Sequence, residues 1–478
     1  MMTPATKIPI QDWMSDPATQ AVLAPLVGSD AADPTILFVG GCVRDALLER
    51  PVVDVDMATV FPPEEVMRRL DAAGIGYHIP GVAHGTVAAH VDGRVFEITT
   101  LRVDVETDGR HAQVAYTDDW ALDASRRDFT INALFADADG NVFDPLGGMA
   151  DIEARQVRFI GDANERIRED ALRILRFFRF NAQLDAEAMD SRGLAACRAS
   201  AEMLGGLSGE RIRDEVFKLL RAPGVKWRLN DDAFPELFGW VLPELPNLKG
   251  CHGLDGIAVI EEEECEYPDA LRRLASLIEA YPLRALEDLP NCKSDAVAIA
   301  GRLRLSGDQK KRLLKMLDRP RELGPRWEQA STFNWDHASA LLPVGRMQTL
   351  QHRFAKEKKV DRSYRPYLYE LDDEAWRDAV LLNWSYREAR IYAAAQSDAP
   401  AQLDPPQQWR DLLDLPRRLP RPEFPLRGAD VLKIGIQQGP DISRLLNEIE
   451  TWWIAGGFEA GRRKCLKELK QRAKRTSN

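Results

Sequence analysis

The stretch ILFVGGCVRDALLERPVVDVDMAT, residues 36–59, contains the features on which the predicted fold depends. Its apolar start, residues 36–39, is typical of a strand, and the pair Gly40 and Gly41 separates that strand from a predicted helix. Backbone N–H groups at the start of a helix can bind a phosphate, and Arg44 would add a cation in the first turn. The alternative is a tight strand-to-helix turn that needs glycine only for its backbone freedom.

Two aspartates lie two residues apart in the second half of this stretch. A strand is predicted over residues 53–58, so Asp54 and Asp56 point to one face while Val55 points into the core. Neighbouring carboxylates repel one another unless a cation lies between them, and oxygen ligands of this kind suit Mg²⁺. We therefore expect a magnesium site here. The alternative is the polar face of an edge strand, with both acids exposed to water.

A third acid, Glu97, interrupts a strand-like run at residues 94–101. Its neighbours Phe96 and Ile98 are apolar, and an acid within a buried strand needs a compensating partner. A metal bound by the two aspartates would be such a partner, which makes Glu97 a candidate catalytic residue. The alternative is an ion pair with Arg102 or with another arginine nearby.

The pattern of the chain changes near residue 150. Before this point, short β-like runs alternate with turn signals and with one helical segment, residues 62–74. After it, apolar residues recur at helical spacing. The pattern predicts an α+β fold, in which a small mixed β-sheet with helices precedes an all-helical remainder. The predicted strands are residues 36–39, 53–58, 86–91, 94–101 and 141–145.

Composition narrows the class of protein. The chain has 478 residues and a net charge of −11, and it has no apolar run near the ~20 residues that a membrane span needs. The six cysteines are scattered without a metal-binding or disulfide spacing, which favours reduced thiols and a cytoplasmic location. The C-terminal segment GRRKCLKELKQRAKR is strongly basic, and it is either a solvated helix face or an RNA contact.

The order GGCVRD and then DVDMAT resembles the signature of polymerase-β-type nucleotidyltransferases. It most resembles the class II family of CCA-adding enzymes and bacterial poly(A) polymerases. The resemblance implies that Asp54 and Asp56 bind two Mg²⁺ ions, one activating the RNA 3′-hydroxyl and one holding the triphosphate and the leaving pyrophosphate. It covers residues 33–225 and, less closely, residues 427–458.

The resemblance also predicts how the chain is divided. It implies a nucleotidyltransferase head followed by all-helical parts called neck, body and tail, and the proline-dense segment before the tail is predicted to be a linker. The predicted parts are the N-terminal extension 1–32, the head 33–150, the neck 151–225, the body 226–396, the linker 397–426 and the tail 427–478 with its basic C-terminus.

A second motif, SRRDFTINALFAD at residues 125–137, also resembles this family. The resemblance implies that Arg127 contacts the nucleotide and that Asp128 and Asn132 shape the ribose side of the site. A guanidinium is a suitable partner for a triphosphate. The alternative for the arginine is an ordinary charge on a helix surface.

The segment REDALRILRFFRF, residues 168–180, carries a polar residue at every third position from Asp170 onward. On one continuous helix, Asp170, Arg173, Arg176 and Arg179 would form a single polar stripe, while the apolar residues between them would face a core. The alternative is a solvated helix face with ion pairs of ~0.2–0.5 kcal/mol each.

In the family that the chain resembles, the positions of Asp170 and Arg173 act as a protein template for the incoming base. Cytosine and adenine both present an amino donor beside a ring-nitrogen acceptor, which an aspartate and an arginine can match. Uracil and guanine reverse these features and would leave the protein groups unpaired. Glu169 is expected to orient Arg173, and Arg176 and Arg179 are left for phosphate or ribose contacts.

The resemblance implies template-independent addition of C, C and A to the acceptor end of tRNA, from CTP and ATP, with release of pyrophosphate. A predicted flexible loop over residues 103–120 favours the complete activity, since it matches the loop with which family members switch from C to A. The alternatives are a poly(A) polymerase, an enzyme that adds only CC or only A, and a catalytically inactive RNA-binding protein. A monomer and a homodimer both remain open.

Overall fold

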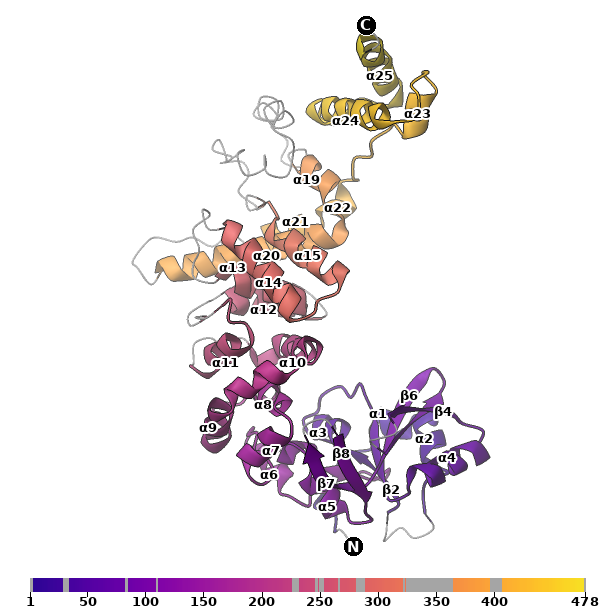
Figure 1. The fold of residues 1–478 in the computed structure, drawn as a ribbon, viewed down its shortest axis with the longest axis vertical. Coiled ribbons are helices and arrows are strands. Elements are labelled where there is room, and N and C mark those ends of the chain that lie inside the picture. The colour runs from indigo at the N-terminus through magenta and orange to yellow at the C-terminus, as the bar shows by residue number, and fades with distance from the viewer. Residues whose placement is uncertain are drawn as a thin grey trace. The chain divides into compact units, whose positions relative to one another are not determined.

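The chain forms two compact units, of which the first contains Met1–Lys249 with Arg302–Arg304 and the second the rest (Figure 1). A computed structural model gives the fold. It describes residues 3–28, 34–81, 85–108, 111–225, 232–245, 248, 253–264, 267–280, 289–320, 323, 364–395 and 406–476.

A mixed β-sheet of eight strands forms the head. In spatial order its strands are β1 (Thr6–Lys7), β10 (Asn141–Phe143), β9 (Phe135–Ala136), β2 (Ile36–Val39), β3 (Asp56–Thr59), β6 (Arg94–Thr100), β5 (Thr86–Val91) and β4 (Gly76–Gly81). Of the pairs described, β3 and β6 run parallel and the others are antiparallel. β2 is buried along its whole length, which explains its uninterrupted apolar sequence.

The strand predictions are confirmed for β2, β5, β6 and β10 to within two residues, and β3 differs at its start. β3 begins at Asp56, so Asp54 lies in the segment before the strand. Much of the predicted loop 103–120 is instead the two-stranded hairpin of β7 (Arg102–Asp108) and β8 (His111–Tyr116). Its alternating sequence RVDVETD is a strand pattern, and the prediction of a loop was wrong there.

The described part of the predicted N-terminal extension packs with the head. β1 joins the sheet beside β10, and the ring of Trp13 meets Phe38 edge-on at 4.8 Å. Helices and one 3-10 turn surround the sheet: α1 (Asp12–Ser15), α2 (Pro17–Leu23), α3 (Gly41–Leu47), α4 (Pro63–Ala72), α5 (Trp120–Ser125) and η2 (Thr130–Asn132). Residues 6–23 therefore contribute to the folded head.

The neck is helical, as predicted, and an aromatic cluster joins it to the head. Its helices are α6 (Gly148–Glu153), α7 (Ala163–Glu169), α8 (Leu172–Leu184), α9 (Ser191–Ala199) and α10 (Gly209–Arg221), and α11 (Ala233–Val241) follows. Phe129, beside η2, lies 4.8 Å from Phe159 and 5.5 Å from Phe180 of α8, measured between ring centroids. Phe159 stacks on Phe177 at 5.4 Å. This cluster anchors α8 against the head segment that carries the second motif.

The second unit is all helical in the residues described. Its helices are α12 (Gly253–Glu264), α13 (Ala270–Ala280), α14 (Leu289–Arg302), α15 (Gly307–Leu317), α19 (Arg365–Glu370), α20 (Asp373–Ala395), α21 (Pro406–Leu413), α22 (Leu415–Arg418), α23 (Gly428–Leu432), α24 (Pro440–Ala455) and α25 (Arg462–Thr476). A buried ion-pair network joins several of them: Arg272 contacts Glu261 at 2.6 Å and Asp378 at 2.8 Å.

The sequence predicts a linker over 397–426, whereas residues 406–418 form α21 and α22. Trp409 of α21 is buried and stacks on Trp384 with 5.8 Å between ring centroids. Trp376 donates its indole N–H to the Leu412 carbonyl at 2.9 Å. Prolines lie at the first helical positions here, where a missing N–H costs nothing, so they mark helix starts in this segment.

The basic C-terminus forms α25, an amphipathic helix. Cys465, Leu469 and Ala473 recur every fourth residue and are buried in one cluster with Trp453 of α24, while Lys467 is exposed. α25 therefore has a solvated basic face opposite its buried side. A contact of this face with RNA stays a prediction. None of the helices described is both long and apolar enough to span a bilayer.

We expect Trp409→Ala to destabilise the second unit by about 3–5 kcal/mol, the usual cost of removing a buried aromatic side chain. Tyr267→Ala is the matched control, because that aromatic side chain belongs to the same unit and is 81% exposed. Urea unfolding followed by circular dichroism measures both changes. Equal, small effects of the two substitutions would mean that residues 406–418 do not pack as described.

Candidate active site

Three carboxylates lie near one another at one end of the parallel strand pair. Asp56 of β3 lies directly opposite Glu97 of β6 in the strand register, and Asp54 comes two residues before Asp56. Val55 between the aspartates is buried, as predicted, while Asp54 and Glu97 are exposed and Asp56 is half-buried. The structure therefore brings the three predicted acids together.

The charge on Asp56 is unfavourable in this environment. Burial raises the pKa of Asp56 to about 6, and the negative charges of Glu97 and Asp54 add to the increase, while Arg127 opposes it. Behind Asp56, burial and the charge of Asp56 raise the pKa of the Cys42 thiol to about 12, so this thiol stays neutral. A cation beside the three acids would relieve their repulsion.

The donor set fits a hard divalent cation, since it consists of carboxylate oxygens. Among the residues described, no three His, Cys, Asp or Glu side chains already converge as metal ligands. Asp54, Asp56 and Glu97 would therefore have to close around an ion. Their carboxylate chemistry suits a divalent cation, and the pairing of β3 with β6 places Asp56 opposite Glu97.

The glycine turn lies between β2 and α3. Gly40 has a φ of +72°, a backbone conformation that favours glycine, and a Cβ there would make only an ordinary contact of 3.5 Å with the Asn132 carbonyl. Arg44 lies at the fourth of the seven residues of α3 rather than in the first turn. Its buried guanidinium donates to Asn132 at 2.6 Å and to Asp45 at 2.9 Å. A phosphate contact by Arg44 stays a prediction.

Arg126 and Arg127 are not ordinary surface charges. Both contact Asp123 of α5, at 2.6 Å and 2.8 Å. Burial opposes the charge on Asp123, but Arg127 and then Arg126 hold the pKa of this carboxyl below its usual range. The sequence analysis missed Asp123. The available signal was its spacing, three and four residues before the two arginines.

A chain of hydrogen bonds continues from the second motif into the neck. Asn132 donates to Asp128 at 3.0 Å, and Arg176 of α8 donates to the other oxygen of Asp128 at 2.7 Å. Burial opposes ionisation of Asp128, but Arg176 and these hydrogen bonds hold its pKa below the usual range. Asp128, Asn132 and Arg176 therefore form a hydrogen-bonded network that joins the head to α8.

The segment that is predicted to select the base is not one continuous helix. α7 ends at Glu169 and α8 starts at Leu172, and Asp170 between them has an extended backbone with φ −153° and ψ 107°. The prediction of a single helical stripe was wrong at this point. The side chain of Asp170 accepts the backbone N–H of Leu172 at 3.1 Å, and aspartate often interrupts helices by such local bonds.

The predicted pairing of Glu169 with Arg173 is confirmed. The Arg173 guanidinium donates to the Glu169 carboxylate at 2.5 Å and to the carbonyl of Arg166 at 3.0 Å. Part of its side chain stays exposed. Arg173 is thereby held in place at the surface.

Arg179 differs from the prediction, because its guanidinium is buried. It donates to Glu215 of α10 at 2.6 Å and to Gln183 at 3.0 Å. A phosphate or ribose contact would need these bonds to break. The sequence analysis missed Glu215, whose signal was an acid on the apolar face of an amphipathic helix.

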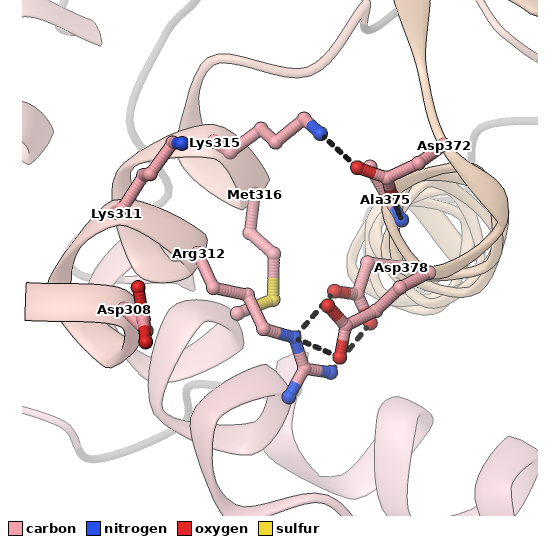
Figure 2. A pocket seen from close by; sticks show the side chains of 9 residues that line it. Asp308, Lys311, Arg312, Lys315, Met316, Asp372, Ala375 and Asp378 are labelled. Carbon is pink, nitrogen blue, oxygen red and sulfur yellow. Dashed lines mark hydrogen bonds and ion pairs between the residues drawn. The ribbon is translucent and has the colours of Figure 1, made fainter.

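A separate pocket of about 280 Å³ lies in the second unit, lined by residues of α15 and α20 (Figure 2). Figure 2 shows Arg312 directed at Asp378 and Lys315 directed at Asp372. These pairs are 2.9 Å and 2.7 Å long. Arg312 and Lys315 are therefore both paired with carboxylates of the pocket wall.

Comparisons with known proteins identify the family of the head and relatives of the whole chain. Residues 36–158 match the family described as the poly A polymerase head domain. The mitochondrial CCA tRNA nucleotidyltransferase 1 of Danio rerio is 31% identical over 437 residues, 91% of this chain and 86% of that protein.

Two solved structures share the fold. The CCA-adding enzyme of Bacillus stearothermophilus in complex with CTP has a TM-score of 0.60 and 24% identity, covering 97% of this chain and 99% of that one. The CCA-adding enzyme of Thermotoga maritima complexed with tRNA has a TM-score of 0.55 and 16% identity, covering 98% and 99%.

With divalent metals chelated, we expect Asp56→Asn to stabilise the protein at pH 7.5. The pKa of Asp56 is raised from its ordinary value of 3.8 to about 6 in the folded protein. The free energy of unfolding therefore falls as the pH rises from about 3.8 to about 6. The loss reaches at most about 3 kcal/mol, and asparagine avoids it. Urea unfolding at pH 7.5 and pH 4.5 measures the difference, which should shrink at the lower pH. Asp139→Asn, at an exposed loop aspartate, is the control, and an equal gain from it would contradict this account.

Proposed function

The chain belongs to the family of CCA tRNA nucleotidyltransferases, and we propose that it adds C, C and A in turn to the 3′ end of tRNA. CTP and ATP are the substrates, and pyrophosphate is released. In each step the RNA 3′-oxygen bonds to the α-phosphorus of the nucleotide while the bond to the leaving pyrophosphate breaks. The observation that carries the proposal is the parallel register of β3 and β6, which sets Asp56 opposite Glu97 and near Asp54.

We propose that Asp54 and Asp56 hold two Mg²⁺ ions and that Glu97 adds negative charge beside them. A divalent metal is the general requirement of nucleotidyltransferases of this head type. When bound, it supplies positive charge that favours a deprotonated 3′-hydroxyl and a charged leaving group. The chain itself positions the carboxylates through the β3–β6 pairing and keeps Arg127 nearby as a counter-charge.

The nucleotide contacts are proposed from the same region. The Gly40 and Gly41 turn lies close to Arg127, whose Nη1 is 3.7 Å from a Cβ built on Gly40. Arg127 can therefore reach a phosphate held at this turn. Asp128 and Asn132, which share a hydrogen bond, are proposed to shape the ribose side of the site.

Base selection is assigned to Asp170 and Arg173. The carboxylate can accept from the amino group of C or A, and the guanidinium can donate to the adjacent ring nitrogen. Arg176 and Arg179 are proposed as positioning residues instead of direct contacts, because Asp128 and Glu215 already bind them.

The partner is the acceptor end of tRNA, and the proposed compartment is the cytoplasm. The four cysteines described are free thiols, as that compartment allows. The similar protein of Danio rerio carries the word mitochondrial in its name, so fractionation of the source cells is needed to test the compartment.

We expect a tRNA transcript that ends at the discriminator base to receive two C residues, then one A, and then no more, with Mg²⁺, CTP and ATP. Gel electrophoresis with labelled CTP or ATP, singly and together, resolves the products. Long tails from ATP alone would indicate a poly(A) polymerase, and arrest after CC or addition of A alone would indicate half of the activity.

In the same assay, Asp54→Asn with Asp56→Asn should lower the rate by about 10³-fold or more, because several kcal/mol of charge stabilisation would be lost. Asp139→Asn is the control carboxylate substitution on the exposed surface of the head. Undiminished incorporation by the double variant would contradict the assigned site.

Arg173→Ala should lower the discrimination of CTP over UTP by about 10- to 100-fold, since a matched hydrogen-bond donor is removed. Arg168→Ala is the control, because Arg168 is an exposed arginine of the adjacent α7. Competition between labelled nucleotides in one reaction measures the ratio. Unchanged discrimination would place base reading elsewhere.

A further inference from the structure

We propose that Arg211 is a positioning residue that orients the base-reading carboxylate of Asp170, an inference that rests on the proposed function. Arg211 belongs to α10, and its Nη2 donates to Oδ2 of Asp170 at 2.8 Å. The two side chains are 47% and 33% exposed, so this ion pair lies at the surface where a nucleotide can approach.

The hydrogen bonds of Asp170 leave room for a base. Oδ1 accepts the backbone N–H of Leu172, and Oδ2 accepts Arg211. Each carboxylate oxygen has two acceptor positions, so each keeps one for the amino group of C or A. With one bond to each oxygen, the plane of the carboxylate is fixed before the base arrives.

The place of Arg211 on its helix supports this role. It is the third residue of α10, and its backbone N–H donates to the Ser208 side chain that caps the helix. A cation in the first turn is unfavourable for the helix dipole. The helix dipole therefore does not explain an arginine here, whereas the ion pair with Asp170 gives its side chain a partner.

α10 is itself held firmly against α8. Glu215, one turn after Arg211, forms a buried ion pair with Arg179 at 2.6 Å. Since Arg211 and Glu215 lie four residues apart on one face, the buried pair sets the position from which Arg211 reaches Asp170. Both base-reading groups are thus held by an opposite charge, Asp170 by Arg211 and Arg173 by Glu169.

The test compares Arg211→Ala with wild type in incorporation of CTP, ATP, UTP and GTP into tRNA, with kcat and KM determined separately. We expect discrimination against UTP and GTP to fall by about fivefold, the upper range for a half-exposed ion pair, with kcat for CTP little changed. Arg211→Lys keeps the charge and should recover part of the discrimination. Arg198→Ala is the matched control, since Arg198 pairs with Glu236 at 2.8 Å with exposures of 46% and 39%.

The outcomes separate this inference from the proposed function. An active, selective wild type in which Asp170→Ala loses selectivity but Arg211→Ala does not would overturn the role of Arg211. An equal fall in incorporation of all four nucleotides by Arg211→Ala would also overturn it, because that is the signature of a contact with RNA or phosphate. A wild type that adds neither C nor A would overturn the proposed function, and the inference with it.

Discussion

Repulsion among carboxylates is the constraint around which the head is built. The parallel pairing of β3 and β6 sets Asp56 opposite Glu97, and Asp54 adds a third negative charge. Because Asp56 is partly buried, its charge is costly without a cation, as its raised pKa shows. A divalent cation beside these carboxylates would relieve this cost, which is why we propose that they hold the metal used in nucleotidyl transfer.

A continuous series of polar contacts connects this site to the segment that we propose selects the base. Arg44 of α3 binds Asn132, Asn132 binds Asp128, and Asp128 binds Arg176 of α8. Removing Arg176 would leave the buried charge of Asp128 without its cation, and breaking a buried ion pair in this way typically costs about 3–5 kcal/mol. This series of contacts therefore fixes α8 relative to the glycine turn of the head. It also fixes the neighbouring Asp170 and Arg173.

Short-range patterns in the sequence correctly predicted the features that depend on residues close together along the chain. The apolar run of β2, the alternation around Val55 and the spacing of Glu169 and Arg173 were enough for those features. The break at Asp170 was not predictable from periodicity, because one side-chain bond to the backbone outweighs a helical pattern of apolar residues. Long-range partners such as Glu215 and Arg211 were also hidden, since their contacts join helices that are distant along the chain.

The central claim is that the carboxylates of Asp54 and Asp56 form the metal site. Its most direct test is a titration of the protein with Mn²⁺ in the presence of CTP, in which the EPR signal of free Mn²⁺ reports how much metal is bound. We expect the wild-type chain and Asp139→Asn to bind Mn²⁺ equally, and Asp54→Asn with Asp56→Asn to lose the protein-dependent sites. Equal Mn²⁺ binding by the double variant and the wild type would contradict the claim that these carboxylates form the metal site.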